Sequence, residues 1–215
     1  MPSNAPLSPT HRSKLHCGCC AFLASIACVG PATDSSYSPS QGAPWAGYVP
    51  DLPVALPPYD QVQASWKQRL DQPYVYLEHV GSYTETGSLI PLLQREMLAQ
   101  ELEPAGPPFA LFFDDPGSTP VAALRSRTCI PVGGKRSPHV PLQYDVLPST
   151  TVVYALVGGP YPDVPRAYPG LYAYLERQNW IENGPLREIY LIPPSSVQSL
   201  DDLLTEVQLP ATARP

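Results

Sequence analysis

A glutamate next to aromatic residues is the feature of this sequence with the clearest chemical use. Glu188 and Tyr190 alternate with Ile189 in the segment 187–192, a pattern typical of a β-strand. Because alternate residues of a strand point to opposite faces, Glu188 and Tyr190 should share one face. A carboxylate beside aromatic rings attracts a planar cation through charge and through cation–π contact. Partial burial would also raise the pKa of Glu188 and make it a candidate general base.

Further aromatic and acidic residues are predicted to join Glu188 on the sheet face that no helix covers. In the segment 74–80, Val75 and Leu77 should meet the helices, so the residues between them should project to the other face. In the segment 187–192, Ile189 and Leu191 should take the helix side. A face of this kind is a natural ligand surface. The predicted ligand-binding residues are Glu188, Tyr190, Tyr76, Tyr154, Phe112 and Glu78.

The elements that would position these residues occur twice, 78 residues apart. Residues 75–116 and 153–194, aligned without a gap, share ten identities in 42 positions, among them Tyr76/Tyr154 and Gly106/Gly184. Each copy reads as a strand, a turn, a helix and a second strand. Two more strands are predicted between the copies, at 121–130 and 142–147. The sequence therefore predicts an α+β fold made of internally duplicated strand–helix–strand units with an antiparallel sheet.

Several of the candidate residues also have a structural interpretation. Glu188 could be a solvated charge at the edge of the sheet, paired with Arg187 or Arg125. Leu156 is the repeat partner of Glu78, which makes a ligand role for Glu78 the less favoured of its two interpretations. The tyrosines could equally be core or interface aromatics, and this applies to Tyr76, Tyr154 and Tyr190.

Residues 72–194 resemble the GyrI-like domain. The resemblance is carried by Val80-Gly81-Ser82-Tyr83, Gly106-Pro107, Phe112-Phe113-Asp114-Asp115-Pro116, Gly159-Pro160-Tyr161 and Glu188-Ile189-Tyr190, in that order. It implies a pseudo-twofold α+β fold with a ligand cleft between the halves. Members include the effector-binding domains of multidrug-sensing transcription activators, gyrase inhibitors, and hydrolases of cyclopropane-bearing toxins. The resemblance also implies that Glu188 holds the position of the glutamate that pairs with cationic ligands in drug-sensing relatives.

Composition and charge narrow the possible partners. The chain carries 13 basic and 19 acidic residues, for a net charge of −6. An acidic chain without a basic patch gains little from phosphate contacts, so no nucleic-acid partner is expected. A DNA-binding helix-turn-helix, as in the transcription activators, is also not expected, because the N-terminal residues are typical of an export signal instead. The sequence contains no run of 18 apolar residues, so no transmembrane helix is predicted.

The ends of the chain are predicted to lie outside the duplicated domain. Residues 1–27 combine a basic start with the apolar stretch 17–27, which is typical of a signal peptide. They run into Ser25-Ile26-Ala27-Cys28, which resembles a bacterial lipobox and predicts lipidation of Cys28; ordinary secretion or a short buried helix is the alternative. Residues 28–71 are expected to form a proline-rich tether. Residues 195–215 are expected to be a C-terminal tail with a short helix over 199–207.

Other chemistry has little support in the sequence. No metal or cofactor is expected, since Cys17, Cys19 and Cys20 lack a second ligand pair at zinc-site spacing. The leading hypothesis is an exported, membrane-tethered domain in the cell envelope that binds a small aromatic or cationic ligand. The first alternative is a hydrolase of strained electrophiles with Glu188 as its general base. The second alternative is a structural envelope module whose aromatic residues form a protein interface.

Overall fold

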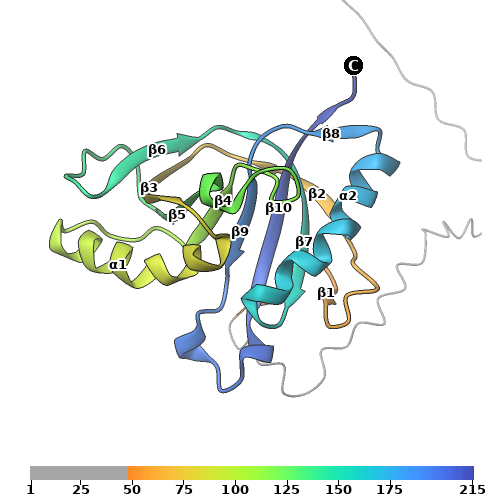
Figure 1. The fold of residues 1–215 in the computed structure, drawn as a ribbon, viewed down its shortest axis with the longest axis horizontal. Coiled ribbons are helices and arrows are strands. Elements are labelled where there is room, and N and C mark those ends of the chain that lie inside the picture. The colour runs from red at the N-terminus through yellow and green to blue at the C-terminus, as the bar shows by residue number, and fades with distance from the viewer. Residues whose placement is uncertain (1–47) are drawn as a thin grey trace, which may run out of the picture. The chain divides into compact units, whose positions relative to one another are not determined.

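Ten strands in one mostly antiparallel sheet, with two α-helices, make up the fold of residues 48–215, the part of the chain that the computed structural model describes (Figure 1). The strand order is β1-β7-β10-β9-β4-β5-β3-β6, and β2 and β8 pair with β7 and β10 outside this path. The predictions for the signal peptide, for Cys28 and for the first part of the tether, 28–47, fall on residues 1–47, outside the described residues. No helix in the described part is long and apolar enough to cross a membrane.

The sheet is built from two halves with matching element order. The first half consists of β3 (Gln72–Val80), the 3₁₀ helix η1 (Tyr83–Leu89), α1 (Ile90–Ala99), β4 (Phe109–Phe112), β5 (Arg125–Pro131) and β6 (Gln143–Leu147). The second half consists of β7 (Thr150–Gly158), η3 (Tyr161–Ala167), α2 (Tyr168–Arg177), β8 (Trp180–Glu182), β9 (Leu186–Tyr190) and β10 (Leu204–Ala213). Two early strands, β1 (Val54–Ala55) and β2 (Ser65–Arg69), add to β7. The bounds of β3, η1 and α1 recur in β7, η3 and α2 at an offset of 78 residues, while the origin of the halves by duplication stays a prediction.

Local sequence explains how each half turns from strand to helix. Gly81 and Gly159 follow the first strand of each half and have φ values of +143° and +113°, which glycine adopts most readily. At Gly159 a Cβ would also lie 2.7 Å from the Tyr59 hydroxyl, so a side chain there would displace the Tyr59 ring. Pro91 and Pro169 stand in the first turn of α1 and α2, where a missing N–H costs nothing.

Both helices pack on the same face of the sheet, as the pairing register shows strand by strand. In the first half, Leu93 and Met97 of α1 pack on Val75 and Leu77 of β3, which confirms the predicted orientation of β3. In the second half, Leu171 and Leu175 of α2 pack on the matching apolar face of β7 and on β10. Each buried leucine contributes roughly 1.5–3 kcal/mol relative to an exposed one. We call the opposite side of the sheet the open face.

The predicted C-terminal helix over 199–207 is wrong. Only Leu200–Asp202 forms a short 3₁₀ helix, and Leu204–Ala213 is strand β10, which pairs with β7 on one side and β9 on the other. A central strand is buried on both faces and is therefore apolar at most positions. Some of these apolar residues fall three or four positions apart, which is also the spacing of a helix. The tether is likewise shorter than predicted, because β1 and β2 within 28–71 belong to the sheet.

Candidate functional site

The centre of the sheet, where β4 pairs with β9, carries one carboxylate on its helix side. In this antiparallel pair Ala110 lies directly opposite Glu188. The two positions are also 78 residues apart, which is the offset between the halves. Ala110 and Glu188 are therefore equivalent positions of the two halves that pair with each other. The Ala110–Glu188 pair therefore marks the local twofold centre of the molecule, and only one of its two residues is charged.

The Glu188 carboxylate is buried and bound by two tyrosine hydroxyls. Tyr168, the first residue of α2, donates to Oε1 at 2.5 Å, and Tyr190 donates to Oε2 at 3.1 Å. No lysine, arginine or histidine of residues 48–215 forms an ion pair with it. Burial raises the pKa of Glu188 from 4.5 to about 7, although the two hydrogen bonds act in the opposite direction.

Two aromatic pairs lie at matching positions in the two halves, each with one ring on the face of the sheet that carries this carboxylate. The ring centroids of Tyr161 and Tyr190 lie 4.6 Å apart, and those of Tyr83 and Phe112 lie 4.7 Å apart. The hydroxyl of Tyr161 donates to the Ile192 carbonyl, which holds that ring in place. We call the whole set the Glu188 cluster, which consists of Glu188, Tyr168, Tyr190, Tyr161, Tyr83 and Phe112.

Only three of the six predicted ligand-binding residues lie in this cluster. Glu188, Tyr190 and Phe112 are together but on the helix side, so the predicted orientation of 187–192 is wrong. Ile189 lies on the open face instead, where it packs with Tyr76. All five residues of β9 are buried, so the alternation of residue types along this strand does not indicate which of its sides faces the helices. The open face holds the other three predicted residues, Tyr76, Tyr154 and Glu78.

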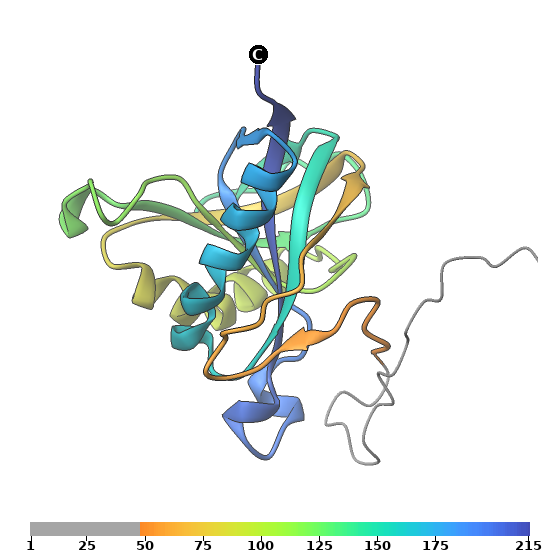
Figure 2. The same cartoon turned by 90° about the vertical axis from the view of Figure 1, so that its right-hand side faces the viewer.

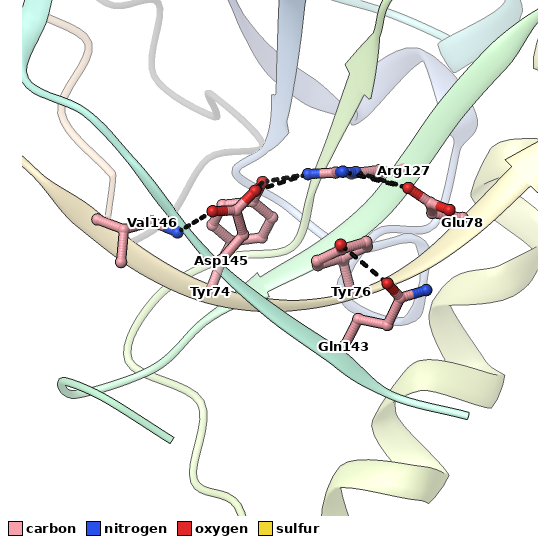
Figure 3. A network of polar contacts seen from close by, with 7 residues as sticks. All are labelled: Tyr74, Tyr76, Glu78, Arg127, Gln143, Asp145 and Val146. Carbon is pink, nitrogen blue, oxygen red and sulfur yellow. Dashed lines mark hydrogen bonds and ion pairs between the residues drawn. The ribbon is translucent and has the colours of Figure 1, made fainter. Parts of the chain in front are cut away.

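The protein's own cations already contact the tyrosines of the open face. The guanidinium of Arg127 lies 4.1 Å from the centre of the Tyr76 ring and forms an ion pair with Glu78 at 3.1 Å (Figure 3). The Lys67 ammonium lies 3.9 Å from the centre of the Tyr154 ring. This arrangement fits the structural interpretation of Tyr76 and Tyr154, because the ring faces that would attract a cationic ligand are occupied.

Neither of the arginines considered as partners of Glu188 pairs with it. Arg187 points to the open face, where its guanidinium lies 3.9 Å from the centre of the Phe109 ring. Arg125 instead forms an ion pair with Asp114 at 2.8 Å. The interpretation of Glu188 as a solvated edge charge is therefore wrong, because β9 is an interior strand and the carboxylate is buried.

Sequence reasoning missed three aromatic members of the cluster. Tyr83 and Tyr161 begin the 3₁₀ helices, and they recur at the 78-residue offset within the Gly-x-Tyr motifs. That recurrence was the available signal. No such recurrence marks Tyr168, because the equivalent residue in the first half is Ile90. No group of three or more potential metal ligands occurs in residues 48–215.

The sheet with two helices on one face, and an aromatic cluster with one carboxylate at its centre, are features of a small-molecule-binding domain. Residues 58–212 match the family model of the GyrI-like small molecule binding domain, and the chain belongs to this family. The matched region begins and ends outside the predicted 72–194, and it includes β2 and most of β10.

Solved structures share the fold at low sequence identity. The C-terminal domain of EcmrR has a TM-score of 0.64 and 21% identity over 71% of this chain and 99% of that one. EcmrR in its complex with DNA has a TM-score of 0.65, and there the chain covers 58% of the relative's length. A hydrolase from Listeria innocua has a TM-score of 0.52 and 10% identity over 75% of this chain and 94% of that one. No curated protein sequence matches the chain.

Proposed function

We propose that this GyrI-like domain binds a lipophilic cation at the Glu188 cluster. The observation that carries the proposal is a buried carboxylate without a cationic partner in the described residues. A buried charge without a counter-ion is costly, which is why its pKa lies near 7. A cationic ligand supplies the missing charge, and its apolar groups pack on the aromatic pairs on either side.

The residues of the Glu188 cluster have different roles in binding the cation. Glu188 supplies the negative charge, and the hydroxyls of Tyr168 and Tyr190 orient its two oxygens. The rings of Tyr161 and Phe112 are held by neighbouring aromatic residues and offer apolar surface. Because a cation stabilises the ionised carboxylate, binding below pH 7 should release a proton, and affinity should rise with pH until it levels off above about 7.

A matched ligand pair tests the role of charge. Benzyltrimethylammonium and neopentylbenzene have nearly the same shape, but only the first is charged. By calorimetry at pH 8 we expect the cation to bind at least tenfold more tightly than the neutral compound. Equal affinity for the two compounds would show that the site selects shape and not charge.

A matched pair of variants tests the location. Glu188→Gln should lower the affinity for benzyltrimethylammonium by at least tenfold, since it removes the charge and keeps the shape. Glu78→Gln is the control, because Glu78 is exposed on the open face and paired with Arg127. If both variants bind like the wild type, the cation binds elsewhere and the proposal fails.

Hydrolysis of a strained electrophile is the second candidate function. It is favoured by the pKa of Glu188 near 7, because a base with that pKa can take a proton from water at neutral pH. The oxygen of that water would bond to the electrophilic carbon as a ring bond to this carbon breaks, and Glu188 would return the proton to the ring atom that leaves with the electron pair. Turnover that persists in Glu188→Ala would exclude this mechanism.

We also propose that the chain is exported and anchored to a membrane by a lipid on Cys28. The basic start, the apolar stretch 17–27 and the lipobox-like Ser25-Ile26-Ala27-Cys28 support it. The mass of the protein extracted from membranes should exceed that of residues 28–215 by the mass of the acyl groups. Cys28→Ala should lose this increment and move to the soluble fraction. An unchanged distribution would contradict the anchor.

A further inference from the structure

A group of buried polar atoms on the open face has no hydrogen-bond partner among the described residues. Its members are Nε of Arg187, Nε of Arg69 and Oε1 of Gln208. Arg187 and Gln208 are each only 3% exposed. Buried polar groups are paired in the great majority of cases, so an unpaired set in one region indicates a partner from outside the chain.

Arg187 is the centre of this group. It lies directly opposite Gln208 in the pairing of β9 with β10, so both side chains project from the same face. No carboxylate in residues 48–215 forms an ion pair with Arg187, whereas Arg127 on the same face has both Glu78 and Asp145. Burial lowers the pKa of Arg187 to about 10, and repulsion from Arg69 acts in the same direction. Arg187 thus lies within electrostatic reach of a second guanidinium, and the Glu206 carboxylate, which also acts on Arg187, is bound by Lys67 and Gln208 instead.

The Gln208 amide adds a requirement on the partner. Its Nε2 donates to Glu206 at 2.6 Å, which fixes the amide with Oε1 as a free acceptor. Glu206 is in turn held by Lys67 at 2.6 Å. A partner must therefore accept hydrogen bonds from the arginines and donate one to Gln208.

We propose that Arg187, Arg69 and Gln208 form a binding site for a small oxyanion that carries a hydroxyl, with hydrogen phosphate as its simplest representative. The anionic oxygens accept from the two guanidiniums, and the hydroxyl donates to Oε1 of Gln208. The ligand must be small, because Arg187 is almost fully enclosed. The site is separate from the Glu188 cluster, since residues 187 and 188 project to opposite faces of β9.

A comparison of phosphate with sulfate tests this requirement. At pH 7.5 the two ions have similar size and charge, but only phosphate carries a hydroxyl. Thermal unfolding of the full chain at matched ionic strength should show a Tm higher by roughly 3–6 °C in phosphate, at ten times its Kd, than in sulfate. Equal Tm values in the two salts would overturn the proposal, because water would then satisfy the unpaired atoms.

Three variants locate the effect. Arg187→Gln should abolish the difference between phosphate and sulfate. Arg127→Gln, the control, removes a guanidinium that also stacks on an aromatic ring of the open face, and it should keep the difference. Gln208→Met should bind both anions equally, since it removes only the acceptor, and it provides a test if Arg187→Gln does not fold. A difference that survives in Gln208→Met, or disappears in Arg127→Gln, would place the anion elsewhere.

Discussion

Glu188 shows how the surroundings of one side chain determine its chemistry. The same carboxylate at the edge of a sheet would be an ordinary surface charge, with a pKa near its usual value. In β9 it is enclosed by aromatic rings and held by Tyr168 and Tyr190, so burial determines its protonation. Its charge state is therefore sensitive to pH, to the two hydroxyl groups and to any cation that approaches.

The stability of the domain should fall as pH rises because of Glu188. Between pH 4.5 and 7 the folded chain keeps a proton on Glu188 that the unfolded chain has released, since burial raises the folded pKa to about 7. The favourable contribution is complete below pH 4.5 and is lost as pH rises through 7, a change of up to about 3 kcal/mol. Urea unfolding at pH 5 and pH 8 should show this difference in the wild type and not in Glu188→Gln.

Tyr168→Phe should raise the pKa of Glu188 above about 7. The Tyr168 hydroxyl bonds the charged form at 2.5 Å and thereby favours ionisation. The carboxyl carbon of Glu188, followed by NMR through a pH titration, reports the value directly. Tyr161→Phe is the control, because that hydroxyl donates to a backbone carbonyl and not to Glu188. A pKa that moves equally in both variants would contradict the assignment.

At the scale of elements, close packing links the start of the domain to its second helix. The segment between β1 and β2 passes over α2 so closely that a Cβ on Gly170 would overlap with Cβ of Val62 (Figure 2). Tyr59, earlier in the same segment, is buried and donates to the Gly158 carbonyl. Residues 59–64 are therefore part of the packed domain and not part of a tether.

Gly170→Ala should destabilise the domain by about 1–3 kcal/mol, because the new methyl group forces Val62 and its backbone away from α2. Gly87→Ala is the matched control, since a Cβ added at Gly87 would have no atom within 4 Å. Chemical denaturation of both variants measures the difference. Val62→Gly in the Gly170→Ala chain should restore part of the loss, and a failure to restore any would point to a different cause.

At the scale of the whole molecule, β10 joins the two halves. It pairs with β7 along seven residues and with β9 along four, while β9 continues the sheet to β4 and the first half. The last strand in the sequence is thus an interior strand of the sheet. The Glu188 cluster depends on it as well, because β10 supports the strand that carries Glu188.

Removal of residues 204–215 should abolish cooperative unfolding, because it exposes the facing edges of β7 and β9. Removal of residues 214–215 is the control, since it leaves every strand pair intact. Circular dichroism during thermal unfolding distinguishes the outcomes. A cooperative transition in the longer deletion would show that the halves associate without β10.

The sequence alone determined the α+β class and the strand, turn, helix and second strand of each half, and it singled out Glu188, Tyr190 and Phe112 as candidates that the structure brings together. These depend on local signals, namely alternation in strands, turn glycines and apolar spacing in helices. The orientation of β3 was predictable for the same reason, since Val75 and Leu77 face a helix that follows directly in the chain.

Only the tertiary structure decided which side of β9 faces the helices and that 204–213 is a strand. Both are interior strands with two buried faces, so no contrast between polar and apolar residues marks their orientation. Their neighbours come from distant parts of the chain, and pairing with those neighbours settles the register. For that reason Tyr168 could not be found from sequence, and Tyr76, Tyr154 and Glu78 were grouped with a carboxylate that lies on the other side of the sheet.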